Sequence, residues 1–378
     1  MGCRPVPIPP GRQPQKSRRT GFPVETGTRQ GPASGIRKKK TMHTATLEPD
    51  NASFAIGEGE SILAAGRRQG FNLPHSCQTG ICGQCRAEIV SGSFRQGEHA
   101  EQALPAEQLA AGKILMCCCY AEGDIRLKVP GYNSSKMPPV KTLPARIASI
   151  EYLHDTAVLR LDMPKKPPFV FLAGQYIEIL LKDGQTRSYS LAGSPSQTGQ
   201  LELHIRKREG GLFAGMLFGS NPVIKEKLVI RIRGPLGTFT LDDDASPLIL
   251  LATGTGYAPV QGILHRLAEN GDTRPVHLYW GGRTVRELYR LEQARELACG
   301  LPKGRFTPVL SRPDADWDGA RGYVWQQVLR DYPDLSQYRV YACGSTAMIS
   351  DAQREFAEKG RLKPESFFAD AFSPAPPI

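Results

Sequence analysis

The sequence predicts a multidomain protein in which an α+β domain, a six-stranded antiparallel β-barrel and a doubly wound parallel-sheet domain follow one another behind a basic tail. Residues 43–132 mix short strand patterns with two short helical stretches, residues 140–242 hold six short β patterns, and residues 245–378 alternate strands with helices. Short strands at regular spacing favour a small barrel. Alternating βαβ units favour a parallel sheet with helices on its faces.

The tail, residues 1–42, carries most of the excess charge. Of the formal net charge of +11, residues 1–41 contribute +9, from ten Lys/Arg and one acid. Rich in Pro, Gly and Arg, this segment cannot bury a core, and we expect it to be disordered. Three interpretations stay open: a solvated arm; a segment that is not translated, since Met42 would make a natural start; or a segment that binds an acidic partner or directs the protein to an organelle.

The rest of the chain is close to neutral, so we expect no nucleic-acid partner. No stretch approaches the roughly 18–20 apolar residues that cross a bilayer, and no charged-then-apolar secretory signal begins the chain. We therefore expect a soluble, cytoplasmic protein without a membrane partner, and a monomer.

The elements of the first domain follow from local patterns. Residues 43–60 alternate around a Pro-Asp-Asn turn and predict a hairpin. "SILAAGRRQG" predicts a helix that Gly70 ends, "RAEIVSG" a strand, and "LPAEQLAAG" a short helix with Pro105 at its start. "DIRLKVPGY" closes the domain, and the polar, Pro-containing residues 133–144 predict a linker.

In the barrel, the strand patterns are "ARIASIEYL", "TAVLRLDMP", "QYIEILL", "RSYSLAG", "LELHIRKR" and "KLVIRIRGPLG", with one helical insertion, "GGLFAGMLFG". In the third domain, "PLILLATGTGYAP" predicts a buried strand, a Gly-rich turn and the start of a helix. "PVHLYWGG", "RFTPVL" and "YRVYACG" predict further strands, and "RELYRLEQARELACG", "YVWQQVLRDYP" and "TAMISDAQREFAEKG" predict helices.

Six of the nine cysteines are clustered: Cys77, Cys82, Cys85, Cys117, Cys118 and Cys119. Without a secretory signal, clustered thiols more often bind metal than form disulfides. The x4–x2 spacing of the first three matches the ligand run of a plant-type [2Fe–2S] cluster. A structural zinc site, which prefers C-x2-C pairs, and inert buried thiols are the alternatives. Spacing alone does not choose the fourth ligand among Cys117, Cys118 and Cys119.

"SCQTGICGQCRAEIVSG" and "ILMCCCYAEGDIRL" resemble the ferredoxin domain at the N-terminus of certain flavin-dependent reductases. The resemblance implies a β-grasp fold of the plant-type ferredoxin kind. It also implies Cys77, Cys82, Cys85 and Cys117 as the metal ligands, and leaves Cys118 and Cys119 without a role.

"RSYSLAG" matches the Arg-x-Tyr-Ser signature of the ferredoxin–NADP reductase superfamily. Arg187 can neutralise a pyrophosphate, Tyr189 can present its ring to an isoalloxazine, and the Ser190 hydroxyl can hydrogen-bond near flavin N5. "HIRK" and "GGLFAGMLF" extend the resemblance, because the family binds FAD phosphate at the start of the inserted helix. The implied contacts in these two stretches are His204, Ile205, Arg206, Gly211, Leu212 and Phe213.

The Gly-Thr-Gly-x-x-Pro form of the superfamily is matched by Gly254, Thr255, Gly256 and Pro259, between a strand and a helix. Such a turn lets the backbone approach a pyrophosphate, although alone it is often only a tight turn.

The resemblance places Cys343 and Gly344, in "YACG", near the nicotinamide, and Phe372 against the flavin; a buried small side chain is the alternative for Cys343. No acidic residue follows the second strand in the place that would bind a ribose 2′-OH. Arg283 could meet a 2′-phosphate or be solvated, so NADH is favoured over NADPH only by the resemblance.

The resemblance covers about residues 43–372. It is strongest to CDP-6-deoxy-Δ3,4-glucoseen reductase-like proteins and, more broadly, to reductase components of ring-hydroxylating and other oxygenases. It implies an NAD(P)H:acceptor oxidoreductase that passes electrons from the nicotinamide through FAD to a [2Fe–2S] cluster and on to a partner oxygenase or dehydrase. One alternative is the glucoseen reductase of deoxysugar biosynthesis itself. A different class is a non-enzymatic metal-binding module with decayed nucleotide domains, against which the intact "RSYS", "GTGYAP" and "YACG" argue.

Overall fold

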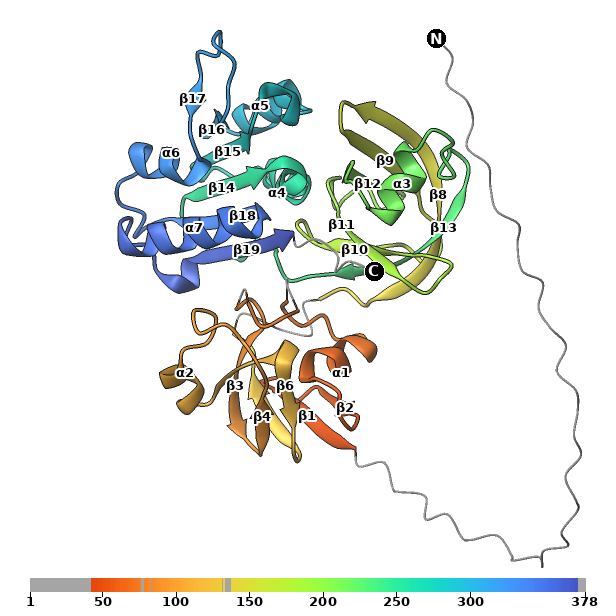
Figure 1. The fold of residues 1–378 in the computed structure, drawn as a ribbon, viewed down its shortest axis with the longest axis vertical. Coiled ribbons are helices and arrows are strands. Elements are labelled where there is room, and N and C mark those ends of the chain that lie inside the picture. Colours follow the sequence, from red (N-terminus) through yellow and green to blue (C-terminus); the bar gives the residue numbers. More distant parts are fainter. Residues whose placement is uncertain (1–41, 76–77, 82, 131, 133–136, 373–378) are drawn as a thin grey trace, which may run out of the picture. The chain divides into compact units, whose positions relative to one another are not determined.

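The computed structural model describes residues 42–75, 78–81, 83–130, 132 and 137–372. Residues 1–41 of the predicted tail lie outside these residues. Three sheets of five or six strands and one two-stranded sheet account for the strands among them (Figure 1). The three-domain fold class expected from the sequence is confirmed. No helix within the described ranges is both long and apolar enough to cross a bilayer.

The first domain is built on a mixed sheet with strand order β2-β1-β7-β3-β5. β1 and β2 form the expected hairpin, while β1 pairs in parallel with β7. The Ser61 side chain accepts a hydrogen bond from the Ala64 backbone N–H, so α1 begins where a polar cap stands before an apolar run. The elements are β1 His43–Glu48, β2 Ser53–Ile56, α1 Ile62–Arg68, β3 Arg86–Ser91, β4 Phe94–Gln96, α2 Ala106–Ala110, β5 Lys113–Leu115, η1 Met116–Cys118, β6 Cys119–Ala121 and β7 Ile125–Lys128.

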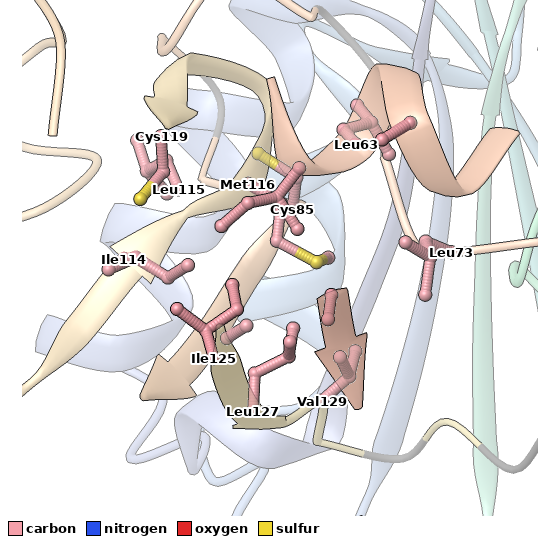
Figure 2. Packing of buried hydrophobic residues seen from close by; sticks show 14 of the residues in the cluster. Leu63, Leu73, Cys85, Ile114, Leu115, Met116, Cys119, Ile125, Leu127 and Val129 are labelled. Carbon is pink, nitrogen blue, oxygen red and sulfur yellow. The ribbon is translucent and has the colours of Figure 1, made fainter. Parts of the chain in front are cut away.

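The core of this domain lies between the sheet and α1 (Figure 2). Leu63 and Leu73 from the helix side belong to the same buried cluster as Ile114 and Ile125 of the sheet. Cys85 and Cys119 are also part of this core, so packing in the core holds two of the clustered cysteines in place.

The second domain is an antiparallel sheet of order β11-β10-β13-β8-β9-β12. The bridge between Leu191 and Leu203 joins the two ends of this order and closes the barrel. The inserted helix α3 is short and buries Phe213 and Leu217 against the barrel core. The elements are β8 Lys141–Leu153, β9 Thr156–Asp162, β10 Tyr176–Leu180, β11 Thr186–Ser190, β12 Gln200–Arg206, α3 Leu212–Phe218 and β13 Val229–Leu236.

The third domain is a parallel sheet of order β17-β16-β15-β14-β18-β19. One apolar cluster packs α4 and α5 on one face, and a second packs α6 and α7 on the other (Figure 1). The elements are β14 Leu248–Thr253, η3 Gly254–Gly256, α4 Tyr257–Glu269, β15 Val276–Gly282, η4 Val285–Glu287, α5 Leu291–Cys299, β16 Gly304–Leu310, β17 Ala320–Arg321, α6 Val324–Asp331, β18 Arg339–Ser345, α7 Thr346–Glu358, η5 Pro364–Ser366 and β19 Phe367–Phe372.

Two details of this domain differ from the expectation. The helix after β15 begins only at Leu291, because Val285–Glu287 form a 3-10 turn whose Glu287 side chain bonds back to the Arg283 N–H. The stretch "FFADAF", in which only an aromatic was expected to matter, is a strand that pairs in parallel with β18.

Candidate functional site

The described part of the predicted cluster site joins the loop before β3 to the turn η1. The Met116 N–H donates to the carbonyl of Cys85 at 3.0 Å, which places the Cys85 and Cys117 segments side by side. Gly80 has φ +76°, and a Cβ there would lie 3.0 Å from the Glu98 carbonyl, so the tight loop requires glycine. A tight glycine loop beside two thiol-bearing segments fits a thiolate-bound cluster. Cys77 and Cys82, the other two predicted ligands, lie outside the described residues.

The three consecutive cysteines have different surroundings. Cys119 is fully buried, and burial, together with the neighbouring Cys118 thiol, raises its pKa to about 12. Its thiol therefore stays protonated and acts as a core side chain, apart from Cys85 in Figure 2. Cys118 Sγ lies 3.8 Å from Cys117 Sγ and accepts a hydrogen bond from Gln96 Nε2 at 3.1 Å. The structure thus separates Cys119 from the loop but keeps Cys117 and Cys118 beside it.

The predicted flavin residues lie along β11. Tyr189 is half-buried and its ring packs on Phe213 of α3, with centroids 5.5 Å apart. The Ser190 backbone is paired with Tyr176 of β10 and its side chain is buried. Arg187 donates to the Thr186 carbonyl and to Gln185 Oε1, both at 2.8 Å. An aromatic face, a hydroxyl and a guanidinium therefore line one strand, a set that fits an isoalloxazine with its phosphate tail.

The segment predicted to hold the FAD phosphates divides into two kinds of residue. His204, Ile205 and Phe213 are buried, so none of these three side chains offers a surface to a cofactor. Gly211 caps α3, where Leu212 begins the helix, and Gly211 and Leu212 remain half-buried. The phosphate contacts proposed there stay predictions for the backbone rather than for the buried side chains.

His204 instead belongs to a buried network between the barrel and the third domain. Its Nδ1 lies 2.7 Å from the Tyr289 hydroxyl and its Nε2 lies 3.1 Å from Glu202 Oε1. Glu202 also accepts from Gln261 at 3.0 Å and from Arg290 at 3.3 Å. Burial would raise the pKa of Glu202, but the hydrogen bond from His204 and the charge of Arg290 lower it to about 2.

Burial lowers the pKa of His204, so the imidazole is neutral. We assign Nε2–H as the donor to Glu202 and Nδ1 as the acceptor from Tyr289. At the centre of the network, the Glu202 carboxylate and the Arg290 guanidinium are paired and largely removed from water. Arg160 pairs with Glu202, and Glu151 with Arg290, on the more exposed sides.

The nucleotide motifs meet at the point where the strand order of the third sheet reverses. β15 lies on one side of β14 and β18 on the other, so the ends of β14 and β18 flank the crevice where open α/β sheets bind ligands. A Cβ on Gly256 would lie 2.2 Å from the Cys343 carbonyl, so "GTG" and "ACG" touch only because glycine stands there. Trp280 supports the loop by donating to the Gly254 carbonyl at 3.1 Å and stacking on Tyr257.

The remaining nucleotide residues lie around this loop. Thr255 is in η3, half-buried, and Pro259 is buried in the first turn of α4, where its missing N–H costs no helical bond. Cys343 is fully buried, and burial raises the pKa of its thiol well above the usual value. Gly344 and Phe372 lie at the carboxyl ends of paired strands, and Phe372 is opposite Ser345. The thiol is thus an inert core group in this arrangement, while the aromatic is half-buried at the predicted edge.

A second junction joins the cluster loop to the barrel. Arg67 of α1 donates to Gln78 Oε1 and to Glu178 Oε1, each at 2.7 Å, and Glu178 is also paired with Arg233. Asn72 exchanges two hydrogen bonds with the backbone of Gly237. These bonds bring the predicted cluster loop beside the strands that carry the predicted flavin residues.

Sequence reasoning missed one acidic residue at the nucleotide site. Glu287 lies in η4, after β15, and lines a cavity of about 520 Å³ together with Gly254. An acid that the sequence analysis did not consider therefore lies after the second strand, and its role toward a ribose stays a prediction. Glu287 is the last residue of a 3-10 turn, in a stretch where the sequence predicted a helix. The four-residue spacing of Arg283 and Glu287 was the available signal that these side chains could pair.

The two junction acids were missed for a different reason. Glu178 in β10 and Glu202 in β12 each stand between apolar residues, as a solvent-facing acid in a strand usually does. The local sequence therefore does not distinguish a buried acid with distant partners from a solvated one. Their partners are far away in the sequence, such as Arg67 and Arg290.

Comparison with protein families gives three matches in the order of the domains. Residues 45–122 match the 2Fe-2S iron-sulfur cluster binding domain, residues 146–241 the oxidoreductase FAD-binding domain, and residues 250–354 the oxidoreductase NAD-binding domain.

Among curated proteins, the chain is 40% identical over 330 residues to the CDP-6-deoxy-L-threo-D-glycero-4-hexulose-3-dehydrase reductase of Yersinia pestis, covering 87% of this chain and 98% of that protein. It is 31% identical over 344 residues to the reductase component of propane 2-monooxygenase from Gordonia sp. strain TY-5, covering 88% and 98%. Among solved structures, the Amycolatopsis cytochrome P450 reductase GcoB matches with a TM-score of 0.72 and 29% identity, covering 88% and 99%. The chain therefore belongs to the family of NAD(P)H-dependent oxidoreductases that join a [2Fe–2S] ferredoxin domain to FAD-binding and NAD-binding domains.

Proposed function

We propose that this protein is the reductase component of a two-protein system and that its cluster delivers single electrons to a separate dehydrase that acts on a sugar nucleotide. The observation that carries the proposal is the 40% identity, over nearly the full length of the relative, to a reductase named for such a dehydrase. A partner oxygenase is the second candidate. It is supported by the 31% identity to a monooxygenase reductase of the same domain order.

The cofactors supply the redox chemistry and the chain supplies positions for them. A nicotinamide gives two electrons as hydride, an iron–sulfur cluster takes one at a time, and a flavin handles both. In our proposal, Tyr189 and Ser190 orient the flavin ring and Arg187 neutralises its phosphates. Gly254, Thr255 and Gly256 hold the coenzyme at the switch point, and Cys77, Cys82, Cys85 and Cys117 hold the cluster.

The Cys117 assignment is tested by separating the two halves of the electron path. With NADH as donor, we expect Cys117→Ser to abolish cytochrome c reduction while ferricyanide reduction, which can draw electrons from the flavin, stays within about twofold of wild type. Visible absorbance checks the cluster itself. Cys119→Ser is the matched control, since that thiol is buried in the core. Equal loss of both activities in Cys117→Ser, or an intact cluster spectrum, would contradict the assignment.

The partner is tested by reconstitution. We mix the purified protein and NADH with a dehydrase and its CDP-6-deoxy-4-hexulose substrate, and measure the product. We expect product to form with the intact protein and not with protein from which the cluster has been removed. Product with a monooxygenase but not with the dehydrase would favour the second candidate. Product with neither partner, despite cytochrome c reduction, would reject both.

A further inference from the structure

The cavity beside Gly254 is strongly basic. It lies outside the carboxyl ends of β14, β15 and β16, and its volume of about 520 Å³ is in the range of small-molecule sites. Four guanidinium groups line it: Arg206 from the barrel and Arg283, Arg286 and Arg312 from the third domain. An anionic ligand is therefore expected there, and on the proposed function it is the phosphate-bearing part of the coenzyme.

Two of these four charges are already held by Glu287. Its Oε1 accepts from Arg283 Nε at 2.7 Å and from Arg206 Nη2 at 2.6 Å, and its Oε2 accepts from the Arg283 backbone N–H at 2.8 Å. Burial alone would raise the pKa of Glu287, but the bonds from Arg283 and the charge of Arg206 lower it to about 2, so the side chain is a carboxylate at neutral pH. Asp155 of the barrel adds a second negative charge to the lining.

The guanidinium groups of Arg286 and Arg312 have no carboxylate partner within the described ranges of the chain. NAD(H) brings two phosphate charges, those of its pyrophosphate, which these two arginines can balance. NADP(H) brings a further phosphomonoester with a charge of roughly −1.5 to −2. That extra charge would meet the Glu287 and Asp155 carboxylates, while Arg206 and Arg283 are occupied.

We propose that Glu287 makes the coenzyme site select NADH over NADPH, by neutralising Arg206 and Arg283 and by keeping a carboxylate in the cavity that a 2′-phosphate would enter. This inference rests on the proposed function, because it takes the cavity to be part of the coenzyme site. Glu287 acts here as a specificity-determining residue and not as a catalytic one.

The test is equilibrium binding of the oxidised coenzymes NAD⁺ and NADP⁺ to the FAD- and cluster-loaded protein by calorimetry. The two coenzymes differ only in the 2′-phosphate, and neither is turned over. We expect wild type to bind NAD⁺ at least about tenfold more tightly than NADP⁺. In Glu287→Gln, the ratio of the NADP⁺ and NAD⁺ dissociation constants should fall by about tenfold, mainly because NADP⁺ binds more tightly. Glu287→Asp, which keeps the charge, should retain most of the preference.

Glu292→Gln is the matched control. It removes the same charge from the same domain, but Glu292 is exposed and pairs with Arg295 outside the cavity lining. Its NAD⁺/NADP⁺ ratio should equal that of wild type. If Glu287→Gln does not fold, the wild-type ratio measured at increasing ionic strength replaces it, since a preference caused by charge repulsion narrows as salt screens it.

The outcomes separate this inference from the proposed function. Equal binding of both coenzymes by wild type, an unchanged ratio in Glu287→Gln, or a salt-independent ratio would overturn the role of Glu287 while leaving the reductase intact. Failure of wild type to bind either coenzyme, together with no flavin bleaching by NADH, would overturn the proposed function and the selectivity with it.

Discussion

The two junctions around the barrel use the same device to different extents. Toward the cluster loop, Glu178 accepts Arg67 and Arg233, and Asn72 bonds to Gly237. Toward the nucleotide domain, Glu202 is bound by His204, Gln261 and Arg290, and Arg290 also reaches Glu151 across the junction. Each junction therefore has one buried acid at its centre, but the second has the denser network around it.

The difference matches what each side has to transfer. Hydride transfer needs reacting atoms about 3–3.5 Å apart in a fixed orientation, so the barrel and the nucleotide domain must be held rigidly. Passing a single electron to a cluster does not require atoms in contact. A junction with fewer buried ionic partners, held by the Arg67–Glu178 pair, two Asn72–Gly237 bonds and the Tyr176–His75 bond, is sufficient there.

The largest expected effect comes from removing the acid of the denser junction. Glu202→Ala leaves Arg290, whose side chain is only 9% exposed, with the half-exposed Glu151 as its remaining carboxylate, and it removes the acceptor of His204 and Gln261. Removing the shared partner of these buried groups typically costs about 3 kcal/mol. Hydrogen exchange measured by mass spectrometry should show about hundredfold faster exchange in β12 and α4. The exposed Glu292→Ala is the control. Unchanged exchange would mean that the network does not hold the junction.

The pH dependence of the same junction tests whether the charge of Glu202 stabilises it. The pKa of Glu202 is about 2 in the folded protein against 4.5 ordinarily. Its stabilisation is therefore complete above pH 4.5 and is lost as the pH falls toward 2, by about 3 kcal/mol at most. The protection difference between wild type and Glu202→Gln in β12 should shrink over this range. A difference that stays constant from pH 6 to pH 3 would refute the charge-based account.

A smaller effect is expected at the cluster-side junction. Glu178→Ala removes the shared partner of Arg67 and Arg233, but the Arg233 side chain is 36% exposed and can be solvated. We expect about 2 kcal/mol, seen as faster exchange in α1 with β12 unaffected. Cytochrome c reduction should fall severalfold while ferricyanide reduction is unchanged. Loss of ferricyanide reduction instead would show that this junction also governs the hydride step.

The smallest effect concerns one hydrogen bond. The Tyr176 hydroxyl lies 2.8 Å from His75 Nε2, between the barrel and the cluster loop. Tyr176→Phe keeps the ring and removes that bond, at a cost of about 1 kcal/mol. Exchange in residues 62–75 should rise by roughly fivefold. An effect as large as that of Glu178→Ala would mean that the acid is not the centre of this junction.

The sequence was sufficient for the fold class, because periodicity, the Cys-x4-Cys-x2-Cys run and the Gly-Thr-Gly turn are local signals. The predicted site residues stay predictions, and the structure shows only where each of them lies. The sequence was misleading where a side chain's environment depends on distant chain. His204 was expected to contact FAD, yet its side chain is buried against Tyr289, a residue 85 positions away. Glu287 was overlooked because it was expected in a helix, whereas it ends a 3-10 turn and lines the cavity beside Gly254.

The position of Trp280 has an optical consequence. Its indole N–H is bonded to the Gly254 carbonyl, directly beneath the loop proposed to receive the coenzyme. The chain has only two other tryptophans, Trp317 and Trp325. With both replaced by phenylalanine, the emission of the remaining indole would report any displacement of that loop, so the protein contains its own fluorescent probe of nucleotide arrival.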